Sequence, residues 1–167
     1  MLIWIVIAIV LLIIDQVTKI LIVSTLVTEG TTLPIIQDFF HLTYVRNAGA
    51  VFGIGSDSGW LFYFFIGAAI IASIVFVILF LKTDHKNPKL WLFSLSLALL
   101  FAGTLGNCCD RIFQLDHQVI DFIDFRGIWP YIFNVADMCL SVGIACFLID
   151  QLLLEPRRVK KNEQTGV

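Results

Sequence analysis

The sequence of residues 60–81 is WLFYFFIGAAIIASIVFVILFL, a run of 22 residues without a charge. A helix rises about 1.5 Å per residue, so a run of this length spans the roughly 30 Å of a bilayer's hydrocarbon core. Three other stretches are similarly apolar and long enough to cross, at about residues 2–26, 90–109 and 131–154. The sequence therefore predicts an all-α membrane protein with four transmembrane helices.

The composition supports a membrane protein formed by a single domain over residues 1–167. Of the 167 residues, 59% are hydrophobic and 14% are charged, whereas soluble domains carry about 25% charged residues. The net charge of -2 argues against a nucleic-acid partner. The first apolar run lacks a basic leader and an A-x-A cleavage motif, so we interpret it as a retained helix rather than a signal peptide.

The distribution of basic residues predicts how the helices are oriented. Lysines and arginines concentrate in the loop between the second and third helices and in the tail at residues 155–167, and they are sparse in the two other loops. Basic loops stay on the cytoplasmic side of a membrane. We therefore expect both termini to be cytoplasmic, and residues 24–59 and 110–130 to face outward.

The first outward segment has the composition of a short β-strand. Residues 39–45, FFHLTYV, are rich in aromatic and β-branched side chains, and the segment that follows contains several glycines. We expect a small extracytoplasmic β element between the first and second helices, near the polar residues of the helices. The second outward segment is apolar at residues 120–129, and we expect it to lie in the membrane interface.

Ionisable residues inside the apolar runs mark a candidate site. On the expected topology Asp137 lies about 10 Å below the outer membrane boundary, and a carboxylate at membrane depth costs roughly 2.5–3.5 kcal/mol. Asp15 reaches a similar level from the first helix, with Lys19 one turn away. Asp15 and Lys19 could form a self-neutralising pair, or they could orient polar groups at a site.

Asp121 and Asp124 are rival partners for Asp137. Both lie in VIDFIDF at residues 119–125, just before the fourth helix. Two carboxylates held close together share a proton, so that one accepts a proton from water while the other donates one to a substrate carbonyl. Spacing alone does not choose between the rivals, and the alternative is an interfacial acid that caps the backbone or pairs with Arg126.

Further polar residues lie near the same level, and each has a structural alternative. Asp110 and Arg111 could form an interfacial ion pair, or Arg111 could hold a substrate carbonyl. Asn47 and Asn134 could bond to neighbouring helices or to backbone, or could hold the backbone of a substrate.

Small and metal-ligating residues add two more expectations. Gly103 fits close helix packing, and Gly106 could in addition let a substrate pass near the backbone. The four cysteines lie in apolar sequence without a C-x-x-C motif, and the three histidines lack metal-ligand spacing, so we expect apolar packing and no metal. Two other classes of protein are alternatives. A proton-coupled carrier would use the intramembrane acids and would need polar groups on both sides of the membrane, and a thiol oxidoreductase would use the cysteines.

Five sequence blocks resemble the lipoprotein signal peptidase (signal peptidase II) family of bacteria. They are DQVTK at residues 15–19, NAGAVFG at 47–53, GNCCDR at 106–111, VIDFIDF at 119–125 and FNVAD at 133–137. The resemblance implies a four-helix membrane aspartyl endopeptidase that cleaves before the cysteine of diacylglyceryl-modified prolipoproteins and releases their signal peptides. It also implies inhibition by globomycin and no need for a metal or organic cofactor.

Within this resemblance the catalytic pair is Asp121 and Asp137, which demotes Asp124. The residues that line or brace the site in the family align with Asp15, Lys19, Asn47, Gly49, Gly103, Gly106, Asn107, Asp110, Arg111 and Asn134. The family implies a bacterial cytoplasmic-membrane protein among membrane lipids, with its site near the extracytoplasmic face, and we expect a monomer. Ala102, where the family usually has a second glycine, and the cysteines at 108–109 depart from the family pattern.

Overall fold

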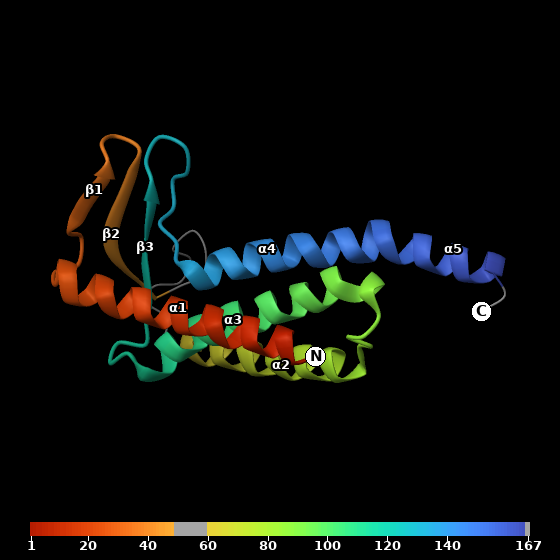
Figure 1. Ribbon diagram of the computed structural model, residues 1–167. Coiled ribbons are helices and arrows are strands. Elements are labelled where there is room, and N and C mark those ends of the chain that lie inside the picture. The colour runs from red at the N-terminus through yellow and green to blue at the C-terminus, as the bar shows by residue number, and fades with distance from the viewer. Residues whose placement is uncertain (49–59, 166–167) are drawn as a thin grey trace.

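Four long helices dominate the structure, a computed structural model that describes residues 1–48 and 60–165 (Figure 1). Each helix contains a run that is long and apolar enough to cross a membrane. They are α1 (Leu2–Leu26), α2 (Trp60–Lys82), α3 (Trp91–Phe113) and a fourth helix that starts with α4 (Val135–Ile149). The prediction of four transmembrane helices is therefore confirmed for the described residues.

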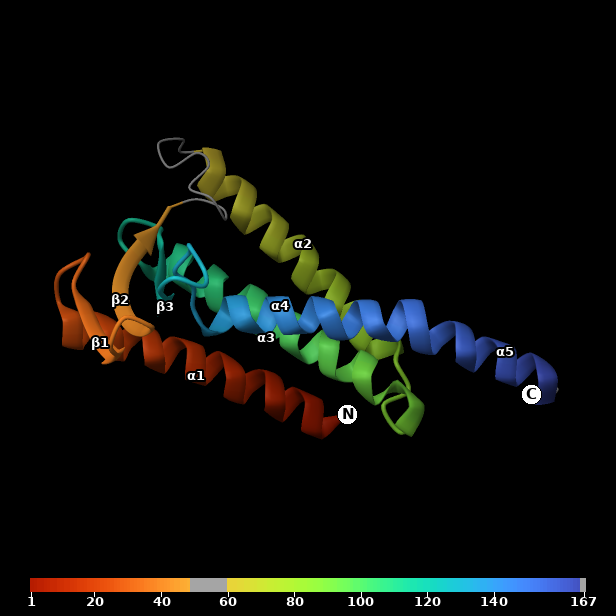
Figure 2. The same cartoon turned by 90° about the horizontal axis from the view of Figure 1, so that it is seen from above.

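Helix α3 packs against each of α1, α2 and α4. Its buried residues include small ones such as Ala98, Ala102 and Gly103. A Cβ at Gly103 would lie 2.5 Å from the backbone carbonyl oxygen of Ala136, so only glycine allows α4 to approach this closely. Helix α2 packs mainly against α3, and Figure 2 shows it diverging from the other helices toward the end that carries the sheet.

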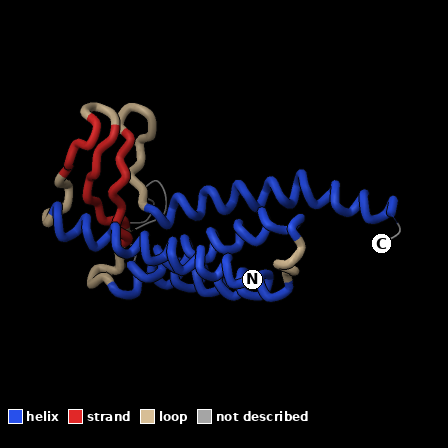
Figure 3. The backbone as a smooth tube through the Cα atoms, in the orientation of Figure 1, coloured by secondary structure: helices blue, strands red, loops and turns tan. Residues whose placement is uncertain are grey.

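A three-stranded antiparallel sheet stands at one end of the helices (Figure 3). Strands β1 (Thr32–Ile36) and β2 (Phe40–Asn47) come from between α1 and α2, as predicted. The third strand, β3 (Val119–Phe125), comes from the segment between α3 and α4 and pairs with β2. The segment expected to be a loop therefore forms a strand over Val119–Phe125, and its first four residues are buried within the protein.

A small apolar core joins the sheet to the end of α1. Its buried members are Ile22 and Leu26 from α1, Tyr44 from β2, and Ile120 and Phe122 from β3. Burying one such side chain contributes roughly 1.5–3 kcal/mol. Five of them therefore hold β3 firmly against α1, and this contact positions the carboxylate of Asp121 between two core residues of the strand.

The fourth helix begins at Val135, not near residue 131 as predicted. Phe133 forms a β-bridge with Ile123, in which the N–H of Ile123 donates at 2.7 Å and the N–H of Phe133 donates at 3.2 Å. These bonds keep the chain extended as far as Asn134, whose side chain caps the helix. A pairing with a distant strand, not the local apolar pattern, decides where this helix starts.

The same helix continues past residue 154, where the sequence predicted a tail. A π-helical segment (Asp150–Leu154) leads directly into α5 (Glu155–Thr165), and α5 extends beyond the other helices in Figure 1. Pro156, expected to follow the helix, lies in the first turn of α5. Proline lacks an N–H and crowds the carbonyl four residues before it, and the wider π-helical turn at that point accommodates the ring. Helix α3 likewise runs past its predicted end at residue 109, to Phe113.

Candidate active site

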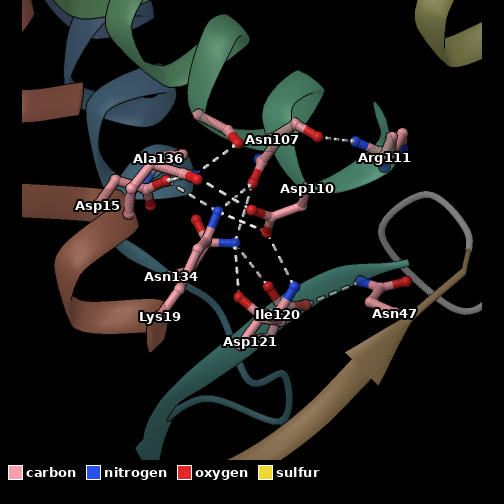
Figure 4. Close-up of polar contacts among 12 residues, drawn as sticks. Asp15, Lys19, Asn47, Asn107, Asp110, Arg111, Ile120, Asp121, Asn134 and Ala136 are labelled. Atoms are coloured by element: carbon pink, nitrogen blue, oxygen red, sulfur yellow. Dashed lines mark hydrogen bonds and ion pairs between the residues drawn. The ribbon is translucent and has the colours of Figure 1, made fainter. Parts of the chain in front are cut away.

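Polar side chains from three helices and two strands meet where the sheet joins the helices (Figure 4). Lys19 of α1 is 1% exposed, and its Nζ lies 2.9 Å from Asp15 Oδ2 and 2.8 Å from Asp110 Oδ2 of α3. Nζ also donates to Oδ1 of Asn107 at 3.1 Å. All three N–H bonds of the ammonium group therefore have an acceptor. The predicted pairing of Asp15 with Lys19 is confirmed, and it extends to a second helix.

Asp15 also contacts the first turn of α4. Its Oδ1 accepts the backbone N–H of Ala136 at 2.8 Å, which satisfies one of the donors that a helix N-terminus leaves open. Gly106 of α3 lies beside this contact, since a Cβ there would come within 2.6 Å of Asp15 Oδ2. Gly106 therefore makes room for a buried carboxylate between helices, which supports its interpretation as a packing residue.

Asn134 and Asp137 form a capping box at the start of α4. Oδ1 of Asn134 accepts the backbone N–H of Asp137 at 2.9 Å, and Oδ2 of Asp137 accepts the backbone N–H of Asn134 at 3.1 Å. Asn107 of α3 donates its Nδ2 to Oδ1 of Asp137 at 2.7 Å. Each carboxylate oxygen of Asp137 is thus oriented by a directed donor.

Asp121 reaches the same cluster from β3 and is 3% exposed. Its Oδ1 accepts Nδ2 of Asn134 at 2.7 Å, and its Oδ2 accepts Nδ2 of Asn47 at 2.9 Å. Asn134 therefore contacts two carboxylates, Asp121 through its side chain and Asp137 through its backbone N–H. Burial, and after it the nearby charge of Asp137, raises the pKa of Asp121 to about 7. A carboxyl group with this pKa carries a proton for part of the time at neutral pH.

Asp124, three residues further along β3, lies in a different environment. Its Oδ2 accepts the hydroxyl of Thr43 at 2.7 Å and Nε of Arg126 at 3.2 Å. Side chains alternate between the two faces of a strand, so residues three apart point to opposite faces. The predicted alternative of pairing with Arg126 is therefore the one that Asp124 adopts, and Asp121 is the acid that shares Asn134 with Asp137.

Arg111 lies at the edge of the cluster. Its Nη1 donates to the backbone carbonyl of Asn107 at 3.2 Å, and its guanidinium carbon lies 4.6 Å from the ring centroid of Phe65 on α2. The alternative of an ion pair between Arg111 and Asp110 is not adopted, because Asp110 pairs with Lys19. Gly49, which also aligns with the family's site residues, lies outside the described residues.

Gln16 belongs to the cluster, although sequence reasoning assigned it no role. Its Nε2 lies 3.1 Å from Asp15 Oδ2, 3.1 Å from Asp110 Oδ1 and 3.2 Å from the carbonyl oxygen of Gly106. An amide inside a membrane helix usually bonds to another helix. The same rule that predicts partners for Asn47 and Asn134 therefore predicts a partner on another helix for Gln16. The backbone N–H of Ile120 donates to Asp110 Oδ2 at 3.1 Å, and the sequence does not predict this contact because any residue could supply the donor.

The remaining predicted groups give little support to the two other classes. The four cysteines are free, with Cys108 and Cys139 buried, which suits small apolar side chains. Within residues 1–48 and 60–165, no group of three or more His, Cys, Asp or Glu residues is arranged to hold a metal ion. A second ionic cluster does surround Asp150 at the far end of the fourth helix. Residues 138–149, between the two clusters on this helix, contain no Asp, Glu, Lys, Arg or His.

The fold and this cluster define a class: multi-pass membrane enzymes whose buried carboxylates gather at one end of the helices. Residues 7–153 match the model of the family described as "Signal peptidase (SPase) II", and the chain belongs to that family. It is therefore a membrane peptidase, and the resemblance drawn from the five sequence blocks is confirmed.

Individual relatives agree with this assignment. A "Lipoprotein signal peptidase" of Desulfitobacterium hafniense (strain DSM 10664 / DCB-2) is 45% identical over 166 residues, which cover 98% of this chain and 100% of the relative. Another from Fusobacterium nucleatum subsp. nucleatum is 39% identical over 157 residues, which cover 90% of this chain and 87% of the relative. A solved structure described as "Bacterial membrane enzyme structure by the in meso method at 2.3 A resolution" has a TM-score of 0.77 and 37% identity, covering 89% of this chain and 87% of that one.

Proposed function

We propose that this peptidase removes the signal peptide from diacylglyceryl-modified prolipoproteins, cleaving before the lipidated cysteine, with Asp121 and Asp137 as its catalytic carboxylates. The relatives named lipoprotein signal peptidases support the substrate class. The observation that carries the catalytic assignment is the position of Asn134, which bonds to both carboxylates. Two acids that contact the same asparagine within a buried polar cluster support an aspartyl peptidase mechanism.

Hydrolysis needs one carboxyl group to accept a proton while its partner donates one. Asp121 is suited to hold the shared proton, because its pKa of about 7 leaves it partly protonated at neutral pH. Asp137 removes a proton from water as the water oxygen attacks the scissile carbonyl carbon, and Asp121 donates its proton to the carbonyl oxygen. The intermediate then collapses. The C–N bond breaks, the departing amine takes the proton from Asp137, and Asp121 recovers its own proton from the gem-diol.

The ionic group on the helices has a positioning role in this scheme. Among the contacts of the described residues, Lys19 reaches Asp15, Asp110 and Asn107 but forms no direct bond to either catalytic carboxylate. Asn107 in turn donates to Asp137. The ammonium group therefore holds the donor that orients Asp137.

Substrate is expected to meet the enzyme at the membrane boundary. Arg111 and Asn47 lie at the edges of the cluster, where directed N–H donors can hold the carbonyl groups of an extended peptide. The diacylglyceryl chains remain among membrane lipids beside the helices. With the termini cytoplasmic, the site faces the outer side of a bacterial inner membrane. We expect the enzyme to act as a monomer and to be inhibited by globomycin.

The experiment that tests this proposal compares Asp121→Asn, Asp137→Asn and the control Asp124→Asn. Each purified variant is given a lipobox peptide with or without the diacylglyceryl group, and release of the signal peptide is measured by mass spectrometry. Loss of a catalytic carboxylate should lower the rate by at least roughly 100-fold, while the control keeps most of its activity. Near wild-type cleavage by either dyad variant would show that the assignment is wrong, and equal cleavage of unlipidated peptide would remove the lipid requirement.

A further inference from the structure

A basic groove lies at the end of the molecule opposite to the candidate active site. It encloses about 280 Å³ and is lined by Lys89, Leu154, Arg157 and Arg158. Lys89 comes from the 3-10 turn before α3 (Pro88–Leu90), and the other three come from the fourth helix and its continuation. Lys89 and Asn107 are separated by about 27 Å along the helix axis at 1.5 Å per residue, so the groove is distinct from the catalytic cluster.

Arg158 is held rigidly in this groove. Its guanidinium donates to the two oxygens of Asp150 at 3.0 and 2.6 Å, and to Glu155 at 2.9 Å. It also donates to the backbone carbonyl of Lys89 at 2.6 Å. The bidentate pair with Asp150, which is 0% exposed, fixes the guanidinium group, and its bond to the Lys89 carbonyl ties α5 to the 3-10 turn before α3. The groove is therefore preformed.

Lys89 and Arg157 are the two basic residues of the groove whose charges could bind a ligand. Both side chains are exposed, and the ion pairs of this region are made by Arg158. Among the residues whose side chains are described, neither Lys89 nor Arg157 has an acidic partner. With Arg158, three cations face two carboxylates, Asp150 and Glu155, so the groove keeps a net positive charge. It is suited to an anion.

The position of the groove indicates which anion it receives. One apolar span begins at Pro88 and another ends at Lys160, so the groove lies at the level of lipid headgroups. Leu154 lines the groove itself, its neighbour Leu153 is 54% exposed, and Trp91, two residues after Lys89, is 53% exposed. Exposed leucines face acyl chains in a membrane, and tryptophan favours its boundary. A ligand with a phosphate and two hydrocarbon chains matches both surfaces.

We propose that this groove binds an anionic phospholipid, with its phosphate on Lys89 and Arg157 and its acyl chains against Leu154 and the neighbouring Leu153 of the π-helical segment. Basic pockets between transmembrane helices recognise headgroups in this way. The site depends neither on the proposed catalytic pair nor on which side of the membrane it faces.

Lipid binding to the purified full-length protein tests this proposal. Native mass spectrometry measures the Kd of phosphatidylglycerol and of phosphatidylcholine for the wild type and for Lys89→Gln/Arg157→Gln. The matched control is Lys86→Gln, which removes an exposed lysine from the same loop but outside the groove. Arg158 is left unchanged because it is structural. Each basic residue near a membrane surface contributes about 1 kcal/mol, so the double variant should bind phosphatidylglycerol roughly 30-fold more weakly.

Three results would overturn the proposal. They are equal affinity of the wild type and the double variant for phosphatidylglycerol, an equal loss in the control, or equal affinity for the two lipids. Inorganic phosphate that competes as tightly as the lipid would assign the groove to free phosphate instead. If the double variant does not fold, Lys89→Arg/Arg157→Lys replaces it. Retained binding then supports the site, since both charges are kept, and lost binding contradicts it.

Discussion

Replacing Lys19 by methionine tests whether one buried cation holds the candidate site together. The variant keeps a side chain of similar length but removes the contacts to Asp15 at 2.9 Å and to Asp110 at 2.8 Å. Both carboxylates are buried, at 1% and 2% exposed. Removing one partner of a buried ion pair costs roughly 3–5 kcal/mol. Because a single cation serves two carboxylates here, we expect a loss near the upper end, about 5 kcal/mol.

Thermal unfolding of the purified protein in one fixed detergent measures this loss. For a chain of this size, each kcal/mol lowers Tm by roughly 2–4 °C, so Lys19→Met should unfold about 10–20 °C below the wild type. Lys82→Met, at the exposed end of α2, is the control and should change little. Adding Asp110→Asn to Lys19→Met removes one uncompensated charge and should recover part of the loss. Equal Tm values for the Lys19 and Lys82 variants, or a further loss on adding Asp110→Asn, would refute the reasoning.

Three further predictions concern the site and its packing. Asn134→Ser keeps an oxygen that can cap α4 but loses the buried donor to Asp121, Ile120 and Asn107, so kcat/KM should fall roughly tenfold or more and the free energy of unfolding by roughly 1–3 kcal/mol. An unchanged kcat/KM would contradict the bridging role. Gly106→Ala places a Cβ 2.6 Å from a carboxylate oxygen of Asp15 and should lower the free energy of unfolding by roughly 1–3 kcal/mol. The control Gly67→Ala, whose Cβ would have nothing within 4 Å, should not lower it. Equal unfolding temperatures of the two variants would argue against close packing at Gly106. The pKa of Asp121 is raised to about 7, and the proposed mechanism uses its protonated form. Cleavage should therefore decline as pH rises above about 7, in the wild type and in Asp124→Asn. A flat pH profile would exclude Asp121 as the proton donor.

The helices were predictable because their signal is local. A run such as residues 60–81 is apolar over the full thickness of a bilayer, whatever the rest of the chain does. Helix ends were less predictable, since they depend on distant partners. The start of α4 is set by the bridge between Phe133 and Ile123, and its continuation past residue 154 depends on the π-helical turn before Pro156. Neither contact has a signature in the neighbouring sequence.

The choice between Asp121 and Asp124 shows a similar limit within the site. Once β3 is known to be a strand, alternation alone places the two acids on opposite faces. The sequence VIDFIDF does not predict a strand by its pattern, because its apolar residues do not alternate with polar ones. The segment has the composition of an apolar loop instead. The resemblance to a known family favours Asp121, and the structure places Asp121 in the cluster, where it pairs with Val45 in the sheet and bonds to Asn134.

The charge balance of the cluster links its stability to its proposed chemistry. Among the residues whose side chains are described, Lys19 is the one buried Lys or Arg, and its ion pairs are with Asp15 and Asp110, on the helices. Asp121 and Asp137 receive neutral amide and backbone donors instead, and within the described residues neither forms an ion pair. Neutral donors orient a carboxylate without cancelling its charge, so the burial of Asp121 beside Asp137 raises the pKa of Asp121 to about 7. Moving a cation to this pair would stabilise the ionised form of Asp121 and would remove the shared proton that acid catalysis requires. The arrangement that braces the helices with Lys19 is therefore compatible with the proposed exchange of a proton between the second acid pair and substrate.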